Sequence, residues 1–177
     1  MRKLVILVLC LCPALFLLGC CQRPDMEKIE ASAKELDAKF TAAFAKEDLD
    51  GVMDCYWNST EVVFYPPDMA AAYGYEAVKA EFEKFFAENE VRGLELTNTG
   101  YMALGEYGLG WGNFSVTLGT PEGGEEKLEG RSTAVSTMKD DKWVYILDHA
   151  SAPLPPPLTL EEMQNIVQEM MKKPIRR

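Results

Sequence analysis

KLEGRSTAVSTMKDDKWVYILDH, residues 127–149, is the stretch of this sequence that decides the fold. Two runs rich in β-branched and aromatic residues, 127–138 and 142–149, flank a pair of turn-forming aspartates. Val, Thr, Tyr and Trp favour strands, whereas Asp favours turns, so this pattern predicts a β-hairpin.

Two more strands are predicted before this hairpin, at 92–103 and 106–118. Gly105 separates these two strands, and the turn-forming sequence TPEGG at 120–124 separates the second from the hairpin. Four consecutive strands joined by short turns predict an antiparallel meander.

The N-terminal half of the chain has the periodicity of helices. Apolar residues recur at spacings of three and four after Asp25, which predicts an amphipathic helix with that aspartate as its N-cap. Two more helices are predicted at 49–57 and 75–88, with a strand at 61–65 between them. Helices followed by a meander indicate the α+β class. We expect a curved antiparallel sheet wrapped on three N-terminal helices.

The N-terminus has the pattern of an export signal. Arg2 and Lys3 precede an apolar run over 4–18, which is short for a membrane-spanning helix of about 20 residues. LLGC at 17–20 resembles the lipobox of bacterial lipoproteins, in which the signal is cut before the cysteine. The resemblance implies lipidation of Cys20 and a membrane anchor in the cell envelope, on the periplasmic or extracellular face, with the outer membrane favoured. A plain secretory signal is the alternative.

The expected organisation has five parts. They are a signal peptide over 1–19, a lipidated cysteine and tether over 20–24, a domain over 25–152, a Pro-rich linker over 153–158 and an amphipathic helix over 159–177. About 158 residues remain after the signal, which is near the usual size of one domain. The last helix either packs back on the domain or serves a partner subunit.

Charge and cysteine content exclude several classes of function. Loss of the signal removes two basic residues and no acidic one, so the net charge falls from −10 to about −12. Nucleic acid is therefore not an expected partner, because its binding depends on Lys and Arg contacts to phosphate. Cys55 is the only cysteine inside the domain, where we expect it in the core, and the chain has one histidine. No zinc site, other metal site or cofactor is expected.

Several stretches resemble the nuclear transport factor two-like superfamily, most closely its SnoaL-like members. They are the opening helix pair over 40–56, VVFYPP and GYEAV over 62–67 and 74–78, and the last hairpin with GRST over 130–133 and KWVYILDHAS over 142–151. The resemblance covers about 26–155 and implies a cystatin-like cone with an internal pocket between sheet and helices. This superfamily contains enzymes, transport adaptors and association domains, so the fold alone does not give the function.

His149 is the first candidate for chemistry. Simple alternation along a strand places His149 on the same face as Tyr145 and places Asp148 on the opposite face. The family pattern directs the histidine face inward, where His149 would act as a general base or hydrogen-bond a ligand. A histidine that only forms the pocket wall is the alternative.

Asp68 is the second candidate. It follows the Pro-Pro pair after the strand predicted at 61–65, where the resemblance implies the mouth of the pocket. A carboxylate there would bind a polar ligand or act as a base, as in isomerase members of the superfamily. A turn-forming aspartate without further role is the alternative.

The expected ligand pocket contains Tyr65, Tyr73, Trp111, Asn113, Arg131, Tyr145 and His149. Its aromatic members suit a small apolar or aromatic ligand, although aromatic residues are also ordinary core components. Arg131 matches the Gly-Arg motif of the family, and a surface ion pair with Glu126 or Glu129 is its alternative role.

Three functional hypotheses remain open, and whether the protein is an enzyme is not decided. The first is a membrane-tethered domain for ligand binding or assembly, forming a homodimer through the sheet. The second is an isomerase or hydrolase that uses His149 and Asp68 as its acid and base. The third is a structural lipoprotein that binds a partner through its C-terminal helix.

Overall fold

The computed structural model describes residues 25–67, 69–153, 159–160, 163–165 and 168. Its helices are α2 (Met26–Phe44), α3 (Leu49–Met53) and α4 (Tyr75–Glu88). Its strands are β1 (Val63–Tyr65), β2 (Ala72–Tyr73), β3 (Glu90–Leu104), β4 (Tyr107–Gly119), β5 (Glu125–Lys139) and β6 (Lys142–Ser151). The expected C-terminal helix and the tether fall largely or wholly outside the described residues.

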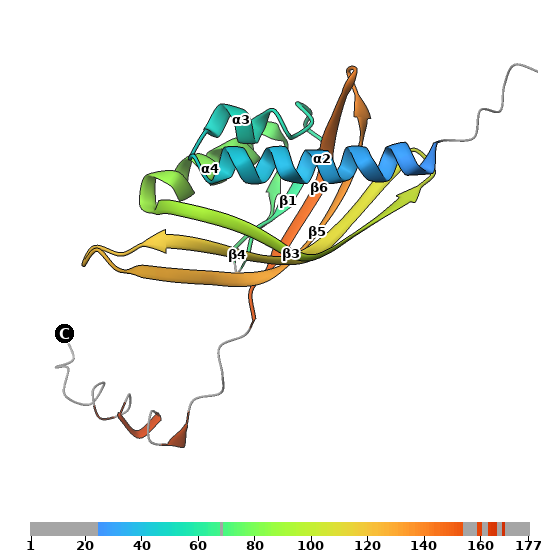
Figure 1. Ribbon diagram of the computed structural model, residues 1–177. Coiled ribbons are helices and arrows are strands. Elements are labelled where there is room, and N and C mark those ends of the chain that lie inside the picture. Colours follow the sequence, from blue (N-terminus) through green and yellow to red (C-terminus); the bar gives the residue numbers. More distant parts are fainter. Residues whose placement is uncertain (1–24, 68, 154–158, 161–162, 166–167, 169–177) are drawn as a thin grey trace, which may run out of the picture.

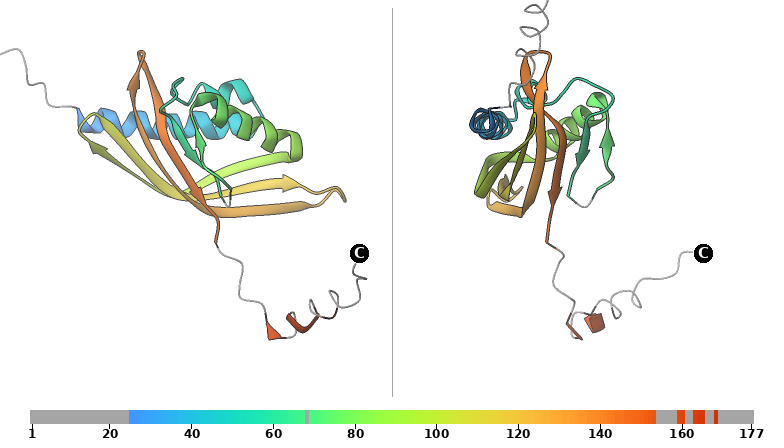
Figure 2. Two further views of the ribbon diagram at one scale, coloured as in Figure 1. Left: turned by 180° about the vertical axis from the view of Figure 1, so that it is seen from behind. Right: turned by 90° about the vertical axis from the view of Figure 1, so that its right-hand side faces the viewer.

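The strands form one sheet with the order β2-β1-β6-β5-β4-β3. β1 pairs with β6 in parallel, and all other neighbours pair antiparallel. The three helices lie on one side of the curved sheet, as Figure 1 shows, and Figure 2 shows α2 end-on against that side. The predicted α+β class, the meander and the helix-wrapped sheet are confirmed.

The first helix begins where the sequence predicts. The Asp25 side chain accepts a hydrogen bond from the backbone N–H of Lys28 at 3.2 Å, which caps the helix. Ile29, Leu36 and Phe44 are buried along one face of α2. No helix of the described residues is long and apolar enough to cross a membrane.

The middle of the chain differs from the expectation in two elements. α3 ends at Met53, because the next residues bond to β6 instead of continuing the helix. The Tyr145 N–H donates to the Cys55 carbonyl at 2.8 Å, and the Trp57 N–H donates to the Tyr145 carbonyl at 3.0 Å. β2 was not predicted, since two residues are too few for a strand pattern.

A β-bulge interrupts the pairing of β5 with β6. Val135 pairs with Leu147 and Ser136 pairs with Tyr145, so Ile146 is an extra residue on β6. An extra residue reverses the alternation of faces beyond it. Tyr145 and Asp148 therefore share one face of the sheet.

An aromatic cluster fills the space between the helices and the sheet. The ring centroid of Phe82 lies 5.1 Å from that of Phe64, 5.6 Å from Tyr56 and 6.0 Å from Phe40. Cys55 is fully buried beside this cluster, as expected, and burial raises the pKa of its thiol to about 11. An inert core role for this cysteine follows.

Candidate functional site

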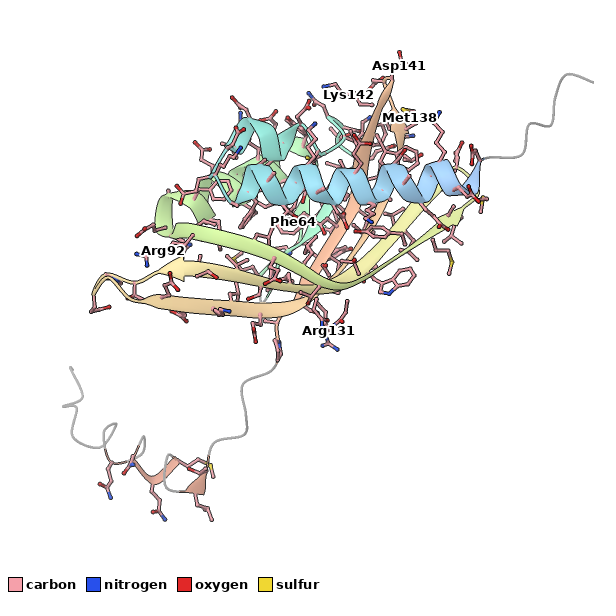
Figure 3. All side chains as sticks on the ribbon, in the orientation of Figure 1. Phe64, Arg92, Arg131, Met138, Asp141 and Lys142 are labelled. Carbon is pink, nitrogen blue, oxygen red and sulfur yellow. The ribbon has the colours of Figure 1, made fainter. Side chains whose placement is uncertain are left out.

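A cavity of about 230 Å³ lies between the helices and the helix-facing side of the sheet. Most of its wall is aromatic or aliphatic. The aromatic part consists of Phe40, Phe44, Phe64, Phe82, Phe85, Trp111, Phe114 and Tyr145. Figure 3 labels Phe64 on the side of the helices and Arg131 on the opposite side of the sheet. The expectation of an internal pocket under the helices is confirmed.

The floor of the cavity is formed by the four central residues of one row of cross-strand neighbours, Phe64, Asp148, Ala134 and Gly110. In strand order this row runs through Ala72, Phe64, Asp148, Ala134, Gly110 and Tyr101, here called the inner row. Ala134 and Gly110 leave space beneath α2 because they have little or no side chain. A Cβ atom added at Gly110 would lie 3.6 Å from a carboxylate oxygen of Asp37, which is ordinary contact.

Asp148 places a carboxyl group on this floor. The Tyr56 hydroxyl donates a hydrogen bond of 2.5 Å to its Oδ2. Burial raises the pKa of Asp148 to about 6, the hydrogen bond from Tyr56 opposes that rise, and the charge of Asp37 adds to it. Asp148 therefore titrates in the range that suits proton transfer at neutral pH.

Asp37 brings a second carboxyl group from the helix side. The Tyr145 hydroxyl donates to its Oδ1 at 2.6 Å, and the Tyr101 hydroxyl donates to its Oδ2 at 2.9 Å. Burial raises the pKa of Asp37, although both hydrogen bonds lower it. The pKa of Tyr145 lies well above its ordinary value because the group is buried beside Asp37, so this phenol stays neutral.

The charged residues of the cavity wall are all acidic. Asp37, Glu81 and Asp148 line it, and no Lys, Arg or His is among the described residues of its wall. Within the described part of the chain, no group of three or more His, Cys, Asp or Glu residues is placed to hold a metal ion.

The predicted orientation of His149 is wrong. Asp148 lines the cavity, whereas His149 is exposed on the opposite face, 6.2 Å from the ring of Tyr65 between centroids. The physical reason is the bulge at Ile146, which exchanges the faces of the two residues.

The other predicted pocket residues divide between the two faces. Tyr145 lies in the cavity wall, whereas Trp111 borders the cavity from the outer face of β4, where it is 40% exposed. The structure places Tyr65, Tyr73, Asn113, Arg131 and His149 outside the wall, with exposed side chains. Asp68 lies outside the described residues.

Sequence reasoning missed both carboxyl groups of the cavity. Asp148 was placed on the wrong face by strict alternation. Asp37 carries a signal that could have found it, because it lies four residues after Ala33 and seven before Phe44 in the apolar stripe of α2. An acidic residue on the buried face of a helix needs a partner inside the protein.

A second row of cross-strand neighbours lies on the opposite face, one residue away along each strand. In strand order it runs through Tyr73, Val63, Leu147, Val135, Leu109 and Met102, here called the outer row. Tyr73 and Met102 are 64% and 46% exposed, and the others are half-buried. No helix of residues 25–153 covers this face in Figure 1.

Comparison with known proteins agrees with this architecture. The family of SnoaL-like domains matches residues 38–146. The chain belongs to the SnoaL-like family. No curated protein matches this SnoaL-like chain.

Solved structures similar to this SnoaL-like chain share its fold at low sequence identity. A nuclear transport factor 2-like superfamily protein from Salmonella enterica has a TM-score of 0.66 at 14% identity, covering 76% of this chain and 97% of the other. A candidate dehydratase of that family from Streptomyces avermitilis has a TM-score of 0.64 at 15% identity, with coverages of 73% and 99%. A candidate calcium/calmodulin dependent protein kinase II association domain from Xanthomonas campestris has a TM-score of 0.61 at 23% identity, with coverages of 71% and 87%.

Proposed function

We propose that this SnoaL-like protein is a membrane-tethered binding domain whose cavity holds a small, largely apolar molecule. The observation that carries the proposal is the aromatic cavity between the sheet and the helices. Apolar walls with a few convergent polar groups are typical of small-molecule sites. Here the convergent groups are the carboxyls of Asp37 and Asp148.

A cavity-filling variant tests the binding proposal. Ala134→Phe would occupy the floor of the cavity, and Ala80→Phe on the exposed side of α4 is the matched control. A metabolite that binds only the folded state raises the unfolding free energy by about 2.7 kcal/mol at 100 times its Kd. We expect such stabilisation by a screened compound in the wild type and in Ala80→Phe, and its loss in Ala134→Phe. Equal stabilisation of all three proteins would contradict binding in the cavity.

The tether is a separate part of the proposal and rests on the sequence at Cys20. Cells grown with an alkyne-bearing fatty acid should label the wild-type protein and should not label Cys20→Ser. Cys21→Ser is the matched control, because it removes the neighbouring thiol. Labelling that persists in Cys20→Ser would refute the anchor.

A second candidate function is acid–base catalysis in the same cavity. We propose that Asp148 would be the proton-transferring group, because burial raises its pKa to about 6 and Tyr56 fixes one of its oxygens. Asp148 replaces the His149 and Asp68 of the sequence-based hypothesis. Its chemistry would be removal and return of a proton at a carbon next to a carbonyl group.

Hydrogen exchange tests this catalytic candidate without knowledge of the product. Each carbonyl compound that binds is incubated with the protein in deuterium oxide, and its mass is measured over time. Catalysis predicts deuterium uptake by the wild type and by Asp54→Asn, an exposed carboxylate outside the cavity. Asp148→Asn should lose the uptake while still binding the compound. Uptake at the uncatalysed rate by the wild type would reject the candidate.

We also propose that two copies associate through the outer row. A two-fold axis would bring two copies of this exposed apolar row together, as in isologous dimers. Light scattering should then give the mass of two chains for the wild type and of one chain for Leu147→Arg, with circular dichroism confirming that the variant folds. Ala80→Arg is the control on the helix side. A wild-type mass of one chain would refute the association.

A further inference from the structure

We infer that the ligand of this cavity is a hydrophobic amine, with its ammonium group against the carboxylate of Asp148 and its apolar body among the phenylalanines. This inference rests on the proposed binding function and names its ligand class. It follows from the charges, the hydrogen bonds and the walls of the cavity.

Within the described residues, no cationic side chain lines the cavity beside its carboxylates. Its ionisable wall residues are the acids Asp37, Glu81 and Asp148. Lys39 and Lys142 are both bound to Asp54 on the surface. Buried carboxylates in proteins are normally paired with a cation or neutralised by a proton. A cationic ligand would supply the missing partner.

The hydrogen bonds inside the cavity favour a donor over an acceptor as ligand. Three phenol groups, those of Tyr56, Tyr101 and Tyr145, donate to the two aspartates. Burial and the neighbouring carboxylates raise the pKa of each phenol, so each keeps its proton and remains a donor to its aspartate. These donors are thus already engaged, and the wall offers carboxylate oxygens as acceptors. An anionic ligand would meet repulsion from the same carboxylates.

The aromatic walls of the cavity suit the apolar body of a hydrophobic amine. Phe64 is stacked on Phe82, and Phe40 meets Phe82 and Tyr145 edge to face. Aromatic faces attract a cation, and they also pack against an apolar body. Few polar groups remain in the wall for a larger polar ligand, chiefly Thr99 and Ser132.

Binding of a cation in this cavity depends on pH. The titratable groups in and around the cavity that holds Asp148 come from several elements: Asp37 of α2, Tyr56 after α3, Glu81 of α4, Tyr101 of β3 and Tyr145 of β6. The pKa of Asp148 is about 6, so at pH 5 most molecules carry a neutral carboxyl there. The affinity for an ammonium group should therefore fall roughly tenfold between pH 7.5 and pH 5.

Three probes of similar shape test the inference: 4-phenylbutylamine, 4-phenylbutanol and 4-phenylbutyrate. Binding to the full chain in lipid nanodiscs is measured by calorimetry at pH 7.5 and pH 5, with subtraction of heats from empty nanodiscs. We expect the amine to bind at least tenfold more tightly than the alcohol at pH 7.5 and the carboxylate more weakly than both. The amine should lose about tenfold in affinity at pH 5, and the alcohol should not change.

Variants link these results to the cavity. Asp148→Asn should show a reduced preference for the amine over the alcohol and a weaker pH dependence, the remainder coming from Asp37 and Glu81, while Asp54→Asn should behave like the wild type. If Asp148→Asn fails to fold, Asp37→Asn is used, with a reduced amine preference expected. Equal binding of amine and alcohol by the wild type overturns the inference and leaves the binding function intact. Absence of binding by all three probes, with no difference between wild type and Ala134→Phe in the metabolite screen, overturns both.

Discussion

The inner and outer rows are built from neighbouring residues of the same six strands, yet they form two different surfaces. The inner row has three small residues and one carboxyl, and it lies under the helices as the floor of a cavity. The outer row is apolar along its whole length, and no helix of residues 25–153 covers it. Backbone pairing is common to both rows. The difference therefore arises from side-chain size, from charge and from which face the helices cover.

The bulge at Ile146 decides which residues of β6 belong to each row. Tyr145 faces the cavity before the bulge, and Asp148 faces it after the bulge. These two residues are three positions apart, whereas successive residues on one face of a regular strand are two positions apart. One extra residue therefore determines that a carboxyl group, and not an imidazole, lines the cavity.

Insertion of one alanine after Ile146 is expected to give the largest effect, because it breaks the assignment of residues to rows. A second extra residue in β6 would turn His149 toward the cavity and remove Asp148 from Tyr56. We expect a loss of more than about 4 kcal/mol in unfolding free energy, measured in urea. Insertion of one alanine after Gly123, in the exposed turn between β4 and β5, is the control and should cost far less. Similar losses in both insertions would show that the residue spacing in β6 has no special role.

Truncation of the cavity wall should have the next largest effect. Phe82 is 4% exposed and contacts five other rings of the wall or core at centroid distances of 5.1–6.3 Å. Phe82→Ala should lower the unfolding free energy by about 3–5 kcal/mol. Thermal and urea unfolding measure this value. A loss below about 1 kcal/mol would mean that the wall is not tightly packed.

The inner row should also respond to pH. The pKa of Asp148 is raised from 3.8 to about 6 on folding, so the folded state binds the proton more tightly than the unfolded state. Its stabilising contribution is complete below pH 4 and is lost as the pH rises through 6, a change of about 3 kcal/mol.

Comparison with Asp148→Asn isolates this pH effect from other carboxyls. The difference in unfolding free energy between wild type and variant should shift by about 3 kcal/mol between pH 4 and pH 7.5, in favour of the variant at high pH. Asp54→Asn should show the opposite direction, because its lysine partners lower the pKa of Asp54. A pH-independent difference for Asp148→Asn would reject the raised pKa.

The outer row should be the least sensitive to truncation within one chain. Met102→Ala should cost less than about 1 kcal/mol in unfolding free energy at low protein concentration, since Met102 is 46% exposed. Measurement over a range of protein concentrations sharpens the comparison: in an associating protein the cost should grow with concentration. A cost above about 3 kcal/mol in the monomer would show that the outer face is part of the core.

Local sequence patterns predicted the elements that local physics determines. The N-cap of α2, the periodicity of α2 and α4, and the alternating strands around Asp140 and Asp141 required no knowledge of distant contacts. α3 was predicted too long, because its end depends on hydrogen bonds to Tyr145, about 90 residues away.

The candidate site was only partly predictable for the same reason. Aromatic side chains around an internal pocket followed from the family resemblance, and Tyr145 lies in its wall. The exchange of His149 for Asp148 depends on the pairing of β5 with β6, which no pattern within β6 reveals. The roles of Tyr56 and Tyr101 depend on contacts across 92 and 64 residues.

The extra residue in β6 also has an evolutionary consequence. If the same residues of β6 paired without the bulge, simple alternation would place the histidine, and not the aspartate, in the cavity without any substitution at either position. Relatives with the same Asp-His pair can therefore differ in cavity chemistry through the presence or absence of the bulge alone. Position-by-position transfer of functional residues among such relatives is sound only where their bulges coincide.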